Sequence, residues 1–185
     1  MLRINTLVKP THQCNMRCKY CFAEKYGYDN SLLDIDYLKK YLSLLSQKFQ
    51  FINLVWHGGE PLMVPLDFYD EIYDYCSEMD TKFIYSLQTN GVLLNQENID
   101  LLKMNGMFPG AVLVVTQNNV DHLVEEYEYF KSLDIGMKVN PMFSDGTAKD
   151  NPFLTMDPDQ YIKNFVTFFK YWPLDTNCIL MFQLV

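Results

Sequence analysis

Short apolar segments alternate with amphipathic ones along the chain, and this alternation restricts the fold more than any other feature. The apolar segments predict strands, and segments with apolar residues three and four positions apart predict helices. Strands joined by helices of this length lie parallel, with right-handed connections, and place ligand sites at their carboxyl ends. The expected fold class is therefore α/β, with about five βα units. The predicted strands are residues 4–8, 51–56, 83–87, 111–116 and 136–140, and the predicted helices are 34–49, 66–79, 96–104, 118–133 and 157–171.

Length and composition favour one folded domain over residues 1–185, because 49% of the residues are hydrophobic, including 13 Phe and 13 Tyr. The net charge is -8, and Arg3 and Arg17 are the only arginines, so we expect neither nucleic acid nor an anionic membrane as partner. The sequence has no apolar run of membrane-spanning length and no signal-peptide pattern at its start. We therefore expect a cytoplasmic protein whose thiols stay reduced.

Three of the five cysteines, Cys14, Cys18 and Cys21, fall within eight residues after the first predicted strand. Cysteine thiolates are the usual ligands of iron–sulfur clusters, and three of them would leave one iron of a cubane cluster open to another ligand. Two alternatives stay open. The cysteines could be small buried hydrophobic residues, or they could form a Cys3His zinc site with His12.

Two further motifs follow the second and third predicted strands. The first, Trp56-His-Gly-Gly-Glu-Pro-Leu62, has two glycines that let the backbone approach a ligand and an acid, Glu60, that could pair with an ammonium group. The second, Leu87-Gln-Thr-Asn-Gly91, places polar groups at the same sheet edge. Ordinary turns are the alternative for both motifs, because Gly-Gly, Pro and Asn-Gly are also common turn signals.

Together the three motifs resemble the radical S-adenosylmethionine (radical SAM) superfamily, and in particular the N-terminal catalytic domain of anaerobic sulfatase-maturating enzymes and SPASM-type peptide maturases. The resemblance implies a partial (βα) barrel that binds a [4Fe–4S] cluster and S-adenosyl-L-methionine. It also implies reductive cleavage to a 5′-deoxyadenosyl radical, which abstracts hydrogen from a peptide or protein substrate. A reductant such as flavodoxin or ferredoxin would be a further partner.

The resemblance also implies residue roles. Cys14, Cys18 and Cys21 would be the metal ligands, and His57 would lie near the substrate, whereas no catalytic base is assigned. The residues that would bind S-adenosylmethionine or line its cavity are Tyr20, Phe22, Gly58, Gly59, Glu60, Gln88 and Asn90. Cys76 and Cys178 are expected to be structural, and Asp145 carries no predicted role.

The sequence departs from the family pattern of six βα units. Only residues 107–110 separate Gly106 from the fourth predicted strand, whereas a βα unit with its return strand takes roughly 30 residues. We therefore expect one unit to be missing and strands 83–87 and 111–116 to be neighbours. A second cysteine cluster of the SPASM type is also absent from the sequence. These departures leave a truncated, non-catalytic protein that keeps cluster or partner binding as the second hypothesis, and a zinc-stabilised α/β domain as the third.

Overall fold

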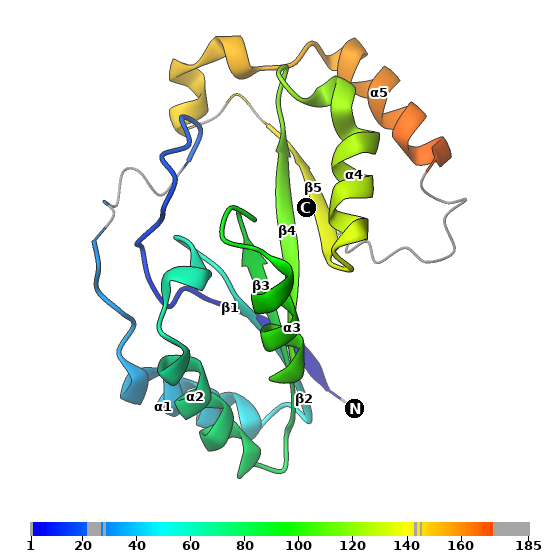
Figure 1. The fold of residues 1–185 in the computed structure, drawn as a ribbon. Helices are drawn as coiled ribbons and strands as arrows, with labels where there is room; N and C mark the ends of the chain where they lie inside the picture. The colour runs from blue at the N-terminus through cyan, green and yellow to red at the C-terminus, as the bar shows by residue number, and fades with distance from the viewer. Residues whose placement is uncertain (1, 22–26, 28, 143, 145, 172–185) are drawn as a thin grey trace. The chain divides into compact units, whose positions relative to one another are not determined.

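A computed structural model describes residues 2–21, 27, 29–142, 144 and 146–171 (Figure 1). The chain divides into two compact units, which we describe in turn. The first contains residues 1–16 and 23–109, and the second contains residues 17–22 and 110–185. The prediction of one domain over residues 1–185 stays a prediction. Within the described residues, no helix is long and apolar enough to cross a membrane.

Five strands form one sheet in the order β1-β2-β3-β4-β5. The strands are β1 (Arg3–Val8), β2 (Phe51–Trp56), β3 (Lys82–Thr89), β4 (Met107–Val115) and β5 (Gly136–Pro141). β1 with β2, β2 with β3, and β4 with β5 are parallel pairs. The predicted α/β class with five βα units is confirmed, and so is the predicted adjacency of β3 and β4, because one follows the other in the sheet.

The described residues of the first unit form the α-helices α1 (Ile35–Ser46), α2 (Leu66–Ser77) and α3 (Gln96–Met104) and the short 3-10 helix η2 (Pro61–Met63). Local signals explain where they begin. The Asp34 carboxylate accepts the N–H of Tyr37 at 2.8 Å, which caps α1. Asn95 and Asn98 form a reciprocal capping box at the start of α3. The core of this unit is apolar, and its fully buried members include Leu38, Leu42, Ile52, Leu54, Trp56, Ile72, Leu87 and Ile99.

The second unit contains the larger part of β4, β5, and the helices α4 (Leu123–Ser132) and α5 (Pro158–Tyr171). Its core is partly aromatic: Phe168 is fully buried, and its ring centroid lies 5.8 Å from that of Tyr127. Its described residues also form the 3-10 helices η3 (Val120–His122), η4 (Gly146–Asp150) and η5 (Pro152–Leu154).

Several predicted boundaries were wrong, and the largest differences are at the starts of β4 and α4. β4 begins at Met107, four residues earlier than predicted, because Pro109 and Gly110 indicated a connection. The strand accommodates Pro109 because the pairing of β4 with β5 starts only at Gly110. The missing N–H of Pro109 is therefore not needed for a hydrogen bond to β5. The predicted helix 118–133 is divided instead: a 3-10 turn comes first, and α4 begins only at Leu123.

Candidate functional site

The cysteine loop is closed at its stem. Thr11 forms an isolated antiparallel bridge with Leu32, and the N–H of Leu33 donates to the carbonyl of Pro10 at 2.8 Å. The Thr11 hydroxyl donates to the carbonyl of Ser31 and accepts the N–H of Gln13 at 3.0 Å. These bonds fix the path of the chain that leads from β1 to Cys14.

Glu60 joins the loops that follow β1, β2 and β3. Its side chain is fully buried, and one carboxylate oxygen accepts the N–H of Leu62 at 2.9 Å and the hydroxyl of Thr89 at 2.8 Å. The other oxygen accepts the N–H of Asn90 at 2.9 Å, and the Glu60 N–H donates to the carbonyl of Gln13 at 2.7 Å. We call Glu60 with these four partners the Glu60 junction.

The junction gives Glu60 a structural role that sequence reasoning missed. A buried carboxylate is costly unless donors satisfy it, and here three donors do so. The Glu-Pro step was the one available signal, because Pro is common at the first position of a helix and the residue before it is then the N-cap, and Glu60 caps η2 in this way. The predicted contact between Glu60 and a ligand amino group stays a prediction.

The two glycines of the turn have positive φ angles, 78° at Gly58 and 46° at Gly59. A Cβ at Gly59 would lie 2.3 Å from the carbonyl oxygen of Gln13 and 2.9 Å from that of Thr11. The turn therefore packs directly against the backbone of the cysteine loop, as only glycine permits. Within the part of the chain that the structure describes, no hydrogen bond to the carbonyl of Gly58 or Gly59 is found.

The end of β3 approaches the first cysteine. The side-chain amide of Asn90 lies 3.7 Å from the Sγ of Cys14 and donates to the Oδ1 of Asn15 at 2.8 Å. The N–H of Met16 also lies 3.4 Å from the same sulfur. Gln88 is half-buried on β3. Thus Cys14, Gly59, Glu60 and Asn90, which the sequence suggested as site residues, are linked through one network.

Cys18 and Cys21 belong to the second unit. The N–H of Cys21 donates to the carbonyl of Cys18 at 2.9 Å, which makes a tight turn. The Tyr20 ring packs on a small apolar cluster formed by Met142, Ala148 and Leu154, and burial raises the pKa of its phenol to about 12. The predicted contact of Tyr20 with adenine stays a prediction. Phe22, Asp145 and Cys178 lie outside the described residues.

The chemistry of the three thiols fits an iron–sulfur cluster, since all three are partly exposed and Cys14 already receives N–H donors of the kind that support thiolate ligands. Cys14 lies in one unit, and Cys18 and Cys21 lie in the other. Among the described residues, no three His, Cys, Asp or Glu side chains are arranged to hold a metal ion. The proposed ligand set therefore rests on donor chemistry and on the spacing of the cysteines along the chain.

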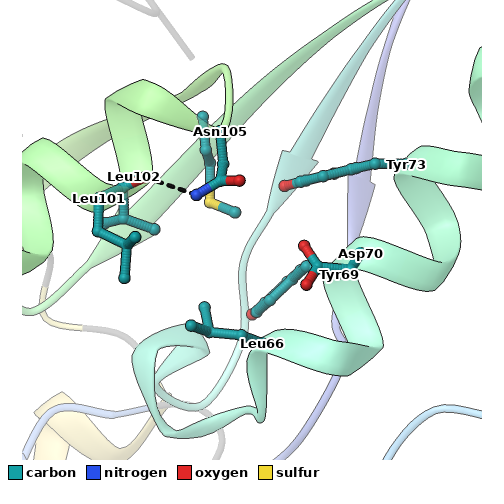
Figure 2. Close-up of a pocket in the computed structure, with 8 residues that line it drawn as sticks. Leu66, Tyr69, Asp70, Tyr73, Leu101, Leu102 and Asn105 are labelled. Atoms are coloured by element: carbon teal, nitrogen blue, oxygen red, sulfur yellow. Dashed lines mark hydrogen bonds between the residues drawn. The ribbon is translucent and has the colours of Figure 1, made fainter.

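A cavity of about 180 Å³ lies elsewhere in the first unit (Figure 2). It is bounded by α2, by the end of α3 and by Met107, and the side chains of Tyr73 and Asn105 point toward it. The hydroxyl of Tyr69 donates to the carbonyl of Pro61, and that of Tyr73 accepts the indole N–H of Trp56. The cavity lies among helix residues and not among the motifs at the carboxyl ends of the strands, so it is not the candidate site.

Comparisons with known proteins match the part of the chain that carries the three motifs. The profile of the Radical SAM superfamily matches residues 8–114, which include all three motifs. A cysteine-type anaerobic sulfatase-maturating enzyme of Clostridium novyi is 30% identical over 123 residues, which cover 61% of this chain and 33% of that enzyme. A serine-type enzyme of Bacteroides thetaiotaomicron is 26% identical over 183 residues, which cover 69% of this chain and 43% of that enzyme. The chain thus spans less than half the length of these relatives.

Solved structures show the same fold. A structure of anSMEcpe with bound AdoMet and Cp18Cys peptide superimposes with a TM-score of 0.75 at 20% identity, over 96% of this chain and 63% of that one. Streptococcus suis SuiB superimposes with a TM-score of 0.66 at 14% identity, over 99% of this chain and 50% of that one. With more than half of its residues matched by the family profile, the chain belongs to the radical SAM superfamily.

Proposed function

We propose that the chain is a radical SAM iron–sulfur enzyme that cleaves S-adenosylmethionine reductively and uses the resulting radical to modify a side chain of a peptide or protein. The observation that carries this proposal is the Glu60 junction. It holds the Gly58-Gly59 turn against the backbone of residues 11–13, immediately before the first cysteine. The start of the cysteine loop and the Gly58-Gly59 turn, to which we assign cluster and ligand binding, are thereby kept together.

The residues of the site would divide the work as follows. Cys14, Cys18 and Cys21 would hold a [4Fe–4S] cluster, which when bound supplies the electron that cleaves the sulfonium bond. The carbonyls of Gly58 and Gly59 would accept hydrogen bonds from the ammonium group of S-adenosylmethionine. The remaining predicted contacts would line the adenosine and substrate sides, and these residues are Tyr20, Phe22, Gln88 and Asn90.

The relatives support the choice of substrate. Sulfatase-maturating enzymes are among the most similar curated proteins, and structures of anSMEcpe and SuiB contain bound peptides. A peptide or protein substrate is therefore the proposal for this chain as well. A reductant such as flavodoxin or ferredoxin would supply electrons, and a reducing compartment such as the cytoplasm would keep the three thiols available.

Anaerobic reconstitution with iron and sulfide tests cluster binding. The wild-type chain should bind about four irons, as a [4Fe–4S] cluster requires, and the variant with Cys14, Cys18 and Cys21 changed to alanine should bind none. Cys76→Ala is the matched control, because Cys76 is buried in α2 and should leave the iron content unchanged. Colourless protein with one zinc after strictly anaerobic purification would contradict the proposal and favour the zinc-stabilised domain.

Catalysis is tested separately by the formation of 5′-deoxyadenosine under a strong reductant. The proposal expects this product from the reconstituted wild-type chain and none from the triple cysteine variant. The second candidate function, a non-catalytic cluster-binding protein, is favoured by one observation: β4 follows α3 after only two residues, without room for another βα unit. The alignment with a sulfatase-maturating enzyme of Clostridium perfringens, which spans 225 residues against the 185 of this chain, supports such a loss. A loaded cluster without detectable 5′-deoxyadenosine would select this candidate.

A further inference from the structure

The side chain of Asn90 has a defined orientation. Its Oδ1 accepts the N–H of Val92 at 3.0 Å. An amide oxygen accepts and its NH2 group donates, so the NH2 group must face the other way, toward Asn15 and Cys14. There it donates to the Oδ1 of Asn15 at 2.8 Å and lies 3.7 Å from the sulfur of Cys14. If the amide oxygen and nitrogen of Asn90 were exchanged, its Oδ1 would face the Oδ1 of Asn15, and two acceptors would meet.

The backbone under Asn90 is also held in place. Its N–H donates to the carboxylate of Glu60, whose side chain is fully buried. Thr89, which is 3% exposed, donates to the same carboxylate and accepts the N–H of Gly91. These bonds hold the amide near Cys14, so the approach to the sulfur is built into the fold of the strand end.

Cys14 thus receives two N–H donors of different origin. The first is the backbone N–H of Met16 at 3.4 Å, which belongs to the same loop. The second is Asn90, 76 residues away in the sequence. Hydrogen bonds to a cysteine sulfur withdraw negative charge from it, and they are among the features that set the potential of an iron–sulfur cluster. A reduced cluster carries more negative charge, so a donor favours the reduced state.

We infer that Asn90 is a positioning residue that raises the reduction potential of the cluster through its amide hydrogen bond to Cys14. The inference rests on the proposed function, because it requires Cys14 to be a cluster ligand. It gives Asn90 a role distinct from the predicted lining of the cofactor cavity. The rival explanation is that Asn90 only shapes the turn after β3, a common use of Asn before Gly.

Two substitutions separate these explanations. Asn90→Leu removes the donor, whereas Asn90→Asp keeps an acceptor for the N–H of Val92 but replaces the donor with a negative charge. In a redox titration followed by electron paramagnetic resonance, the midpoint potential should fall in Asn90→Leu and fall further in Asn90→Asp. Asn105→Asp is the matched control, because Asn105 is exposed after α3 and its substitution adds the same charge away from the strand end. Its potential should equal that of the wild type.

Iron content is measured on the same samples and separates the possible failures. If the wild-type chain binds no iron, the proposed function fails and this inference fails with it. If all variants load the cluster and the potentials of Asn90→Leu and Asn90→Asp equal that of the wild type, the inference alone is wrong. If neither variant loads, Asn90→Ser decides, because it retains a turn acceptor but is too short to reach the sulfur. An unshifted potential in Asn90→Ser would overturn the inference, and a lower one would support it.

Discussion

The two units hold their parts of the cysteine loop by different means. In the first, Pro10 and Thr11 form hydrogen bonds with the backbone of residues 31–33, and the carbonyl of Gln13 accepts the backbone N–H of Glu60. The buried carboxylate of Glu60 is held in turn by three further donors. In the second, Tyr20 packs on an apolar cluster, and the ammonium of Lys19 lies 5.1 Å from the centroid of the Phe153 ring. The carbonyl of Lys19 also accepts the side-chain N–H of Asn151 at 2.9 Å. Directional bonds fix geometry more tightly than apolar contacts do. Substitutions at the junction should therefore disturb the site itself, whereas substitutions in the second core should act mainly on stability.

The largest loss of stability is expected in the second core. Phe168→Ala should lower the free energy of unfolding by roughly 3–5 kcal/mol, because a fully buried aromatic ring is replaced by a cavity. Phe169→Ala in the same helix is the control, since that side chain is 38% exposed and should cost less than half as much. Urea denaturation followed by circular dichroism measures both. Equal losses would show that α5 does not depend on this core.

Loss of the Glu60 carboxylate should give the second-largest decrease in the free energy of unfolding. Glu60→Ala leaves the hydroxyl of Thr89 and the part-buried N–H groups of Leu62 and Asn90 without their acceptor, and a buried unsatisfied group such as the Thr89 hydroxyl costs about 1–3 kcal/mol. Glu60→Gln should cost less, because it retains one acceptor oxygen. Glu71→Ala is the control, since this exposed acid makes a surface ion pair with Lys39, which is worth about 0–1 kcal/mol.

Iron content sharpens this test. Glu60→Ala should lose iron binding under conditions in which Phe168→Ala, measured well below its own unfolding transition, retains it. If Glu60→Ala retained iron and Phe168→Ala lost it, the proposed difference between the two units would be wrong.

Substitution of Gly59, in the turn after β2, should lower the free energy of unfolding by a smaller amount than the loss of the Glu60 carboxylate. Both Gly59→Ala and Gly106→Ala place a side chain at positive φ, which costs about 1–2 kcal/mol. Only at Gly59 does the added Cβ meet backbone, whereas nothing lies within 4 Å at Gly106. Gly59→Ala should therefore lose more stability than Gly106→Ala and also lose iron, as thermal unfolding and iron analysis would show. Equal behaviour of the two variants would mean that the turn does not need its close contact with the loop.

Alkaline pH should weaken the first unit. Burial raises the pKa of Tyr69, Tyr73 and Tyr85 above the ordinary value near 10. The folded state therefore binds these protons more tightly than the unfolded state, so this stabilisation is complete below pH 10 and is lost as the pH rises further. In absorbance titrations at 295 nm these phenols should ionise late and together with unfolding. Tyr85→Phe should remove one late-titrating group, whereas titration of all tyrosines near pH 10 in the folded chain would contradict the burial.

Local signals predicted most of the fold and part of the site. The bounds of β2 and α3 agree with the prediction, because an apolar run ended by Gly-Gly and an Asn cap are strong short-range signals. The start of β4 was missed because Pro109 in a strand is uncommon. The Glu60 junction could not be predicted, because its bonds to Thr89 and Asn90 join residues about 30 positions apart. The contact of Asn90 with Cys14 depends on the same long-range pairing.

The most direct test of the whole account is a Mössbauer spectrum of the chain reconstituted with 57Fe, recorded with and without S-adenosylmethionine. Three cysteine ligands leave one iron of a [4Fe–4S] cluster open. We therefore predict that about one quarter of the iron signal changes when S-adenosylmethionine is added. A spectrum of four equivalent irons that S-adenosylmethionine does not alter, or a preparation without iron, would contradict a cluster with one iron open to this ligand.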